Sequence, residues 1–176
     1  MGLVEFSNVD WQDKKVAEFA TYWNGLGREQ GLPYQSEFNP AKVRHLLPGI
    51  AIYELKPNGD ILCRLMGTGL SEQFGWDYTD HNFLELWAEE HHDIVRESFK
   101  TALSKPCGIF NKMHGISETG IVIKANSVGF PALDGDGNAV RLVFYSATEE
   151  PNVVREPRRD KVIKIKTQGQ CFVALD

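Results

Sequence analysis

Apolar residues recur at helical spacing near the start of the chain, between positions 13 and 29. They are Val16, Phe19, Ala20, Trp23 and Leu26. Steps of three or four residues place these side chains on one face, which predicts an amphipathic N-terminal helix. Pro33 cannot continue a helix, so the helix must end before it. A second, shorter helix is expected over 41–47, because Asn39 is a good cap and Pro40 fits a first turn.

The pattern then changes to short apolar runs that predict strands. The runs at 50–55 and 61–66 flank the turn 57–60, whose Asn-Gly pair is a strong hairpin signal. A longer amphipathic helix is predicted over 89–104, ending before Pro106. Three more strands are predicted at 108–116, 121–131 and 139–148. Because their connections are short and rich in turn residues, neighbouring strands are expected to pair antiparallel.

This order of elements predicts an α+β fold, in which a sheet has one face covered by short helices. We expect residues 1–47 to form a helical lead-in packed on the domain and residues 48–148 to form its core. Residues 149–176 are expected to hold a linker and a C-terminal strand, or a hairpin turning at Gly169. Apolar and basic residues alternate over 163–166, which favours an edge strand.

The amino-acid composition argues against one class of binding partner. The chain has 176 residues and a net charge of -5, which argues against nucleic acid because phosphate binding needs concentrated Lys and Arg. The stretch 155–166 is locally basic, but Glu156 and Asp160 dilute it and no aromatic residue lies within it. We interpret this stretch as a solvated linker and edge strand.

The cysteines and the N-terminus bear on location. Cys63, Cys107 and Cys171 are odd in number and widely spaced, so neither a disulfide framework nor a thiolate metal site is expected. The first residues lack the basic start and apolar core of a signal peptide, and no apolar run reaches the length of a membrane span. A cytoplasmic protein without membrane association is therefore expected.

Several short motifs in a fixed order resemble the PAS superfamily, and more closely its stand-alone bacterial PAS-like proteins. The motifs are Tyr22-Trp23, Gly31-Leu32-Pro33, Phe38-Asn39-Pro40, Leu46-Leu47-Pro48, Arg64-Leu65-Met66-Gly67-Thr68, Phe74-Gly75 and Pro106. The resemblance covers residues 20–148 and implies a five-stranded antiparallel sheet whose concave face, covered by the central helices, holds a cavity. PAS domains typically sense ligands or mediate association. Asp80 departs from the pattern, which often has glycine there, so a different turn is expected between the helices.

The resemblance makes a set of residues candidates for lining that cavity, although each is also a plain core residue by type. They are Tyr53, Met66, Phe74, Trp87, Phe130 and Tyr145. Arg64 lies within an apolar strand and has two interpretations that depend on which way the strand alternates. It either faces the cavity, as an anion anchor or the partner of a buried carboxylate, or it lies on the solvent side.

Three histidines raise the question of a bound cofactor or a catalytic base. A histidine on the helix that begins near His91 and His92 is the iron ligand in haem-binding PAS relatives, but these two residues also suit a solvated helix start. The cysteine-centred motif of flavin-binding PAS relatives is absent, and no cofactor is expected. His114 lies on a predicted strand without a Ser, Asp or Glu at a spacing typical of a catalytic base.

A metal site is not expected. The stretch 134–138 places oxygen donors as in a calcium loop, but Ala139 and Tyr145 stand where such a loop needs Gly and Glu. A hairpin turn accounts for this stretch better.

We therefore expect a non-catalytic sensory or signalling domain that binds a small molecule or a protein partner in a PAS-type cavity. Since nothing after Thr148 resembles an output module, the signal is expected to pass to a separate protein or through oligomeric state. A homodimer formed through the first helix and burial of that helix on its own domain are both open. The alternatives are a pure dimerisation module, and a small isomerase or dehydratase on a cone of sheet and helix, with His114 or an Asp as base.

Overall fold

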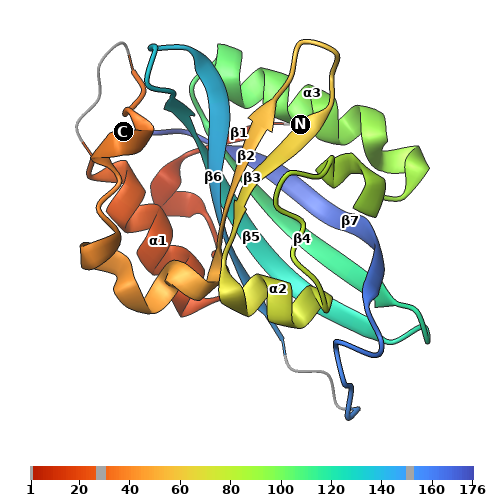
Figure 1. The fold of residues 1–176 in the computed structure, drawn as a ribbon. Helices are drawn as coiled ribbons and strands as arrows, with labels where there is room; N and C mark the ends of the chain where they lie inside the picture. Colours follow the sequence, from red (N-terminus) through yellow and green to blue (C-terminus); the bar gives the residue numbers. More distant parts are fainter. Residues whose placement is uncertain (1, 27–30, 150–152) are drawn as a thin grey trace.

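The computed structural model describes residues 2–26, 31–149 and 153–176 (Figure 1). A single sheet of seven strands runs through this part of the chain in the order β1-β7-β4-β5-β6-β2-β3. The strands are β1 (Leu3–Val4), β2 (Ile50–Leu55), β3 (Ile61–Met66), β4 (Gly108–Ser117), β5 (Val122–Leu133), β6 (Ala139–Thr148) and β7 (Val162–Val173). The α-helices are α1 (Lys14–Asn24), α2 (Thr68–Phe74) and α3 (His92–Ser104). Short 3-10 helices are η1 (Phe6–Asn8), η2 (Gln35–Glu37), η3 (Pro40–Gly49), η4 (Phe83–Leu86) and η5 (Glu89–His91).

The five predicted strands form the continuous antiparallel block β3-β2-β6-β5-β4, and the α+β class is confirmed. The sheet nevertheless has seven strands because β7 pairs along the whole of β4, and β1 then pairs parallel with β7. Gly169 does not turn a hairpin. It lies inside the single strand β7, next to an irregularity opposite Lys112 and Met113.

The amphipathic helix is α1, and its start is capped by Asp13. The Asp13 carboxylate accepts hydrogen bonds from Lys15 N at 2.7 Å and Val16 N at 3.0 Å, which satisfies amide groups left free by the first turn. Its apolar stripe is buried against β5 and β6 of its own sheet. The helix ends at Asn24, and the predicted continuation into 27–30 lies outside the described residues.

Helices therefore cover both faces of the sheet (Figure 1). We call the side packed against α1 and η3 the α1 face, and the side packed against α2, η4 and α3 the α3 face. Each face has its own cluster of buried residues. The central helices cover one face as expected, and the opposite face is covered by α1, whose burial on its own domain was one of the two arrangements left open for it.

The two remaining helical predictions were close. The predicted helix 89–104 corresponds to η5 followed directly by α3. The stretch 41–47 lies within the 3-10 helix η3, which is kinked at Val43, and Asn39 accepts a hydrogen bond from Ala41 N at 3.0 Å.

Asp80, where the PAS pattern often has glycine, adopts a left-handed conformation with φ 68°, which Asp tolerates better than most residues. The turn thus takes a conformation that glycine would favour.

Candidate functional site

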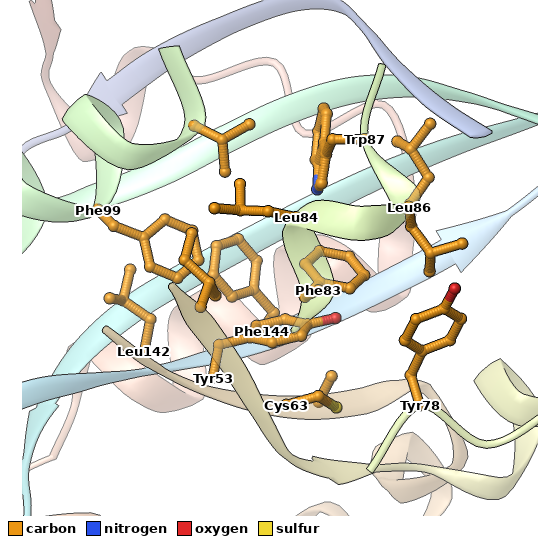
Figure 2. Packing of buried hydrophobic residues seen from close by; sticks show 14 of the residues in the cluster. Tyr53, Cys63, Tyr78, Phe83, Leu84, Leu86, Trp87, Phe99, Leu142 and Phe144 are labelled. Carbon is orange, nitrogen blue, oxygen red and sulfur yellow. The ribbon is translucent and has the colours of Figure 1, made fainter. Parts of the chain in front are cut away.

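A cavity of about 70 Å³ lies on the α3 face, between the sheet and the central helices. Its walls are mainly apolar, and aromatic rings from both layers contribute to them. These rings are Tyr53, Phe74, Phe83, Trp87, Phe99 and Phe144, and Figure 2 shows most of them within the buried cluster. A concave, apolar space between a sheet and short helices is typical of small-molecule sites.

The alternation of the strands sends every second side chain toward the cavity. On β4 these are Ile109, Asn111, Met113 and Gly115, and on β5 they are Ile123, Ala125 and Ser127. Gly115 and Ala125 have the smallest side chains, which leaves space between the sheet and the helices. A Cβ atom added at Gly115 would come within 3.4 Å of Val162 Cγ1.

Strand β7 supplies a further wall through Val162, Ile165 and Gln170. Its place beside the helical layer is held by the backbone, since Ala88 N donates to Ile165 O at 2.9 Å. Residues that the sequence pattern assigned to a linker and an edge strand thus help to enclose the cavity.

Four polar side chains of the cavity wall bind one another in two pairs, and a fifth binds a neighbour outside the wall. Ser98 Oγ donates to Ile94 O and accepts from Gln170 Nε2, both at 2.6 Å. On the sheet, Ser146 Oγ donates to Ser127 Oγ at 3.0 Å. Asn111 Oδ1 accepts from Thr167 Oγ1 at 2.8 Å, which ties β4 to β7.

The cavity carries no formal charge. No Asp, Glu, Lys, Arg or His lines it among the residues that the structure describes. Burial, together with the nearby Cys63, raises the pKa of Tyr53 well above its ordinary value, so its phenol is neutral. A charged ligand would lose its hydration here without gaining a counter-charge.

An open outer pocket of about 600 Å³ adjoins the cavity. The two spaces share Leu70 and Gln73 of α2 with Ser146 and Thr148 of β6. The outer pocket also reaches Lys14 and Lys15 at the start of α1. These four shared residues form the boundary between the cavity and the outer pocket.

Three of the predicted cavity residues, Tyr53, Phe74 and Trp87, lie on the cavity wall. Met66 belongs to the same buried cluster without lining the space. Phe130 and Tyr145 instead lie on the α1 face, where both pack against Phe19. Their strand positions alternate with those that face the cavity, and Tyr145 lines only the outer pocket.

Arg64 lies on the exposed side of the edge strand β3, as one of its two interpretations had it. Its Nε atom is 3.7 Å from Glu54 Oε2, and Arg141 Nε is 3.3 Å from the same oxygen. Lys56 Nζ is 3.0 Å from the other carboxylate oxygen, Oε1. Partial burial by itself would raise the pKa of Glu54, but the hydrogen bonds from Lys56 and Arg141 outweigh it and lower that pKa. Arg64 is therefore part of a surface ion-pair network around Glu54.

The histidines also lie away from the cavity. His91 Nδ1 accepts a hydrogen bond from Thr167 N at 3.3 Å, and His92 Nε2 is 3.0 Å from Trp87 O. Both therefore join the start of α3 to its neighbours. The expectation of no cofactor, with haem as the less favoured option, stays a prediction. His114 lies between Met113 and Gly115, which both face the cavity, so its own side chain is on the α1 face.

Metal and thiol chemistry are not apparent at this site. Within the described ranges, no group of His, Cys, Asp and Glu side chains is placed to hold a metal ion. The stretch 134–138 forms a hairpin turn in which Asp134 accepts from Asp136 N and Asn138 N, each at 2.9 Å. The cysteines are free thiols. Burial and the nearby Asp77 raise the pKa of Cys63 to about 12, which leaves it a weak nucleophile.

Sequence reasoning missed part of the wall. Phe83, Phe99 and Phe144 lie on the cavity beside the predicted aromatics, and Asn111, Ser98 and Gln170 supply polar groups. The residue Asn111 could have been found, because it shares its strand face with the apolar Ile109 and Met113. A polar residue between two inward-facing apolar ones is a marker of a site or a buried network.

Together these features define an α+β domain with an internal cavity enclosed by a sheet and a helical layer. The PAS_5 family model, described as a PAS domain, matches residues 12–142. The chain therefore belongs to the PAS domain family, whose members are of the sensory signalling class, as the resemblance predicted. None of the curated proteins has a significantly similar sequence.

Solved structures with a similar fold include three proteins named as receptors or sensors. An RNA-binding light-oxygen-voltage receptor is 15% identical with a TM-score of 0.49, and the match covers 70% of this chain and 36% of that one. The chain thus spans about a third of that receptor. The dark structure of the blue-light photoreceptor Aureochrome1 LOV is 15% identical with a TM-score of 0.47, covering 64% and 84% of the two chains. A sensory box histidine kinase/response regulator from Burkholderia thailandensis is 12% identical with a TM-score of 0.41, covering 62% and 84%.

A PAS domain from a protein of Colwellia psychrerythraea is 12% identical with a TM-score of 0.46, and the match covers 63% of this chain and 98% of that one.

Within the part of the chain that is described, no helix has the length and apolar character needed to cross a membrane.

Proposed function

We propose that this protein is a sensory domain that binds a small molecule in the cavity of the α3 face. The observation that carries the proposal is the cavity of about 70 Å³, with aromatic walls and an open pocket beside it. Protein interiors are otherwise close-packed, and empty space costs stability. An enclosed space in a domain of the sensory class therefore supports a ligand.

The size of the cavity limits the ligand. Sites for drug-sized molecules usually measure about 300–1,000 Å³, so the space admits a very small molecule or opens further on binding. The helix α2 supplies Leu70 and Gln73 and spans only seven residues. Its movement would join the cavity to the outer pocket.

We propose no catalytic reaction. An enzyme of the isomerase or dehydratase type needs two titratable groups that converge within one pocket. The described residues place only the neutral phenol of Tyr53 there, with His114 on the other face of the sheet. This arrangement favours binding over proton transfer.

The signal would pass to a separate cytoplasmic signalling protein or to a second copy of the chain. The free thiols support a reducing compartment. Since the apolar stripe of α1 is buried on its own sheet, a homodimer would use another surface, such as an exposed sheet edge. A pure dimerisation module is the alternative if the cavity binds nothing.

The experiment compares wild-type protein with Ala125→Phe, which fills the cavity from β5. Both are screened against small apolar compounds by the shift in melting temperature, together with native mass spectrometry of freshly purified protein. The matched control is Val122→Phe on the same strand, whose side chain is exposed. Wild type and V122F should respond to the same compounds, and A125F to none. The absence of any wild-type ligand, or equal binding by A125F, would rule the proposal out.

A further inference from the structure

The indole N–H of Trp87 is a buried donor without an acceptor. The residue is 6% exposed, and its Nε1 atom is buried and makes no hydrogen bond within the described part of the chain. Leaving such a donor unpaired costs about 1–3 kcal/mol. Because native proteins pair the large majority of buried polar side-chain atoms, this exception points to a missing acceptor.

Trp87 is held firmly at the cavity wall. Its backbone N–H donates to Leu84 O at 3.0 Å, its carbonyl oxygen is 3.0 Å from His92 Nε2, and it bridges to Ile165 of β7. In Figure 2 the indole nitrogen lies at the end of the ring that points toward Leu84 and Phe83. The donor therefore points into the aromatic part of the cluster.

A second buried tryptophan shows what is special about this position. Trp23 Nε1 is also unpaired, but its ring stacks on Phe130 at 6.0 Å with an interplanar angle of 10°. It belongs to the cluster of the α1 face and lines neither the cavity nor the outer pocket. Of these two donors, only that of Trp87 adjoins a space that a ligand can enter.

Phe83 lies between Trp87 and a second polar group of the wall, the Tyr53 hydroxyl (Figure 2). The Phe83 ring is stacked on Tyr53 at 4.4 Å and stands at 86° to Trp87 at 6.2 Å. No hydrogen bond of the Tyr53 hydroxyl occurs within the described residues. The two polar groups thus lie on either side of the Phe83 ring.

We propose that the occupant is a neutral, mostly apolar small molecule with a hydrogen-bond acceptor, and that Trp87 Nε1–H donates to this acceptor. The uncharged wall excludes ions, and the aromatic rings favour a flat molecule. The inference rests on the proposed function, since it specifies the ligand of the same cavity.

The test uses pyridine and benzene, which are nearly equal in size and shape, although only pyridine has a ring nitrogen that accepts a hydrogen bond. Their dissociation constants are measured by NMR titration at a pH where pyridine is uncharged, for wild type, Trp87→Phe and Trp23→Phe. Loss of one hydrogen bond should weaken pyridine relative to benzene about five-fold in W87F. In W23F this ratio should stay as in wild type. In wild-type protein, pyridine and not benzene should move the Trp87 indole resonance downfield.

The outcomes separate the two proposals. If both probes bind wild type but the ratio is unchanged in W87F and the Trp87 resonance does not respond, the role of Trp87 is refuted while ligand binding stands. If neither probe binds at saturating concentration, the cavity is closed to small molecules and both proposals fail. The wild-type resonance, assigned through its neighbours in the sequence, decides the question even if W87F does not fold.

Discussion

The Asp160 carboxylate accepts a hydrogen bond from Ser117 Oγ at 2.8 Å, across 43 residues of sequence. Thr119 adds two more, from its backbone N at 2.9 Å and its Oγ1 at 2.8 Å. These contacts fix the segment before β7 to the turn between β4 and β5. Because β7 begins two residues later and supplies Val162 to the cavity wall, the anchor also positions one side of the site.

Asp160→Asn should weaken this anchor, because an amide of the same shape cannot accept all three bonds. We expect the melting temperature to fall by roughly 3–8 °C, with faster amide exchange at the start of β7. Asp136→Asn in the exposed β5–β6 turn is the control, and its melting temperature should stay within about 2 °C of wild type. Equal effects of the two changes would show that the Asp160 anchor contributes nothing specific.

The lowered pKa of Glu54 predicts an acid-dependent loss of stability. A carboxyl whose folded pKa lies below its unfolded value stabilises the protein above the unfolded pKa, near 4.3, and this contribution is lost as the pH falls through the folded pKa. Urea unfolding between pH 7 and pH 3 should therefore show wild type losing more stability than Glu54→Gln over the acid end of that range. Parallel pH curves for the two proteins would contradict the ion-pair network of Glu54.

The substitution Gly75→Ala tests how closely the segment before β7 packs on the end of α2. Its φ is +87°, and an added Cβ would lie 2.1 Å from Pro157 O. Gly120 has nearly the same φ, +88°, with nothing within 4 Å of its Cβ position. Both alanine variants incur a backbone cost of about 1–2 kcal/mol, and Gly75→Ala adds a steric cost of about 1–3 kcal/mol. Urea denaturation should rank G75A clearly below G120A, and identical stabilities would mean that the contact with Pro157 yields without cost.

Two lysines flank a histidine on the α1 face beyond the reach of α1. His114 of β4 lies directly between Lys124 of β5 and Lys166 of β7, and Lys166 also forms an ion pair with Glu90 at 3.9 Å. Directly opposite charges on neighbouring strands contribute about 0.2–1 kcal/mol, and like charges destabilise. The two lysines are separated by the strand β4, so the repulsion between them is weaker. Lys124→Glu should therefore raise the free energy of unfolding by about 0.2–0.5 kcal/mol at low salt, and the gain should shrink in 1 M salt.

The control for this charge effect is Lys42→Glu, which makes the same change of net charge on the 3-10 helix η3, away from these strands. Its effect should be close to zero. A gain of equal size in K42E would attribute the stabilisation to overall charge instead of the cross-strand neighbours.

Local patterns along the chain determine much of this protein. The run 139–148 forms β6 with the bounds that its pattern predicts, and the capped apolar stripe after Asp13 forms α1. These features depend on neighbours within one or two turns of the chain, where backbone geometry and side-chain spacing act directly.

Local sequence patterns did not decide toward which face of the sheet each side chain of the central strands points. Apolar residues run almost without interruption through the second half of β5, because helices cover both sides of the sheet there. With no polar alternation, the sequence could not tell that Phe130 points to the α1 face while Ser127 points to the cavity. In β3, where one side is open, alternation was informative but allowed two registers for Arg64.

What the sequence determined by itself is the set of elements, the PAS resemblance, and the aromatic residues from which a cavity is built. Only the tertiary structure decided which of these residues share a space, since Tyr53, Trp87 and Gln170 come from three distant parts of the chain. It also placed β7 between β4 and β1, which turned an expected edge into a wall of the site. The physical reason is that such pairings depend on hydrogen bonds and burial between segments far apart in sequence, and no local spacing records them.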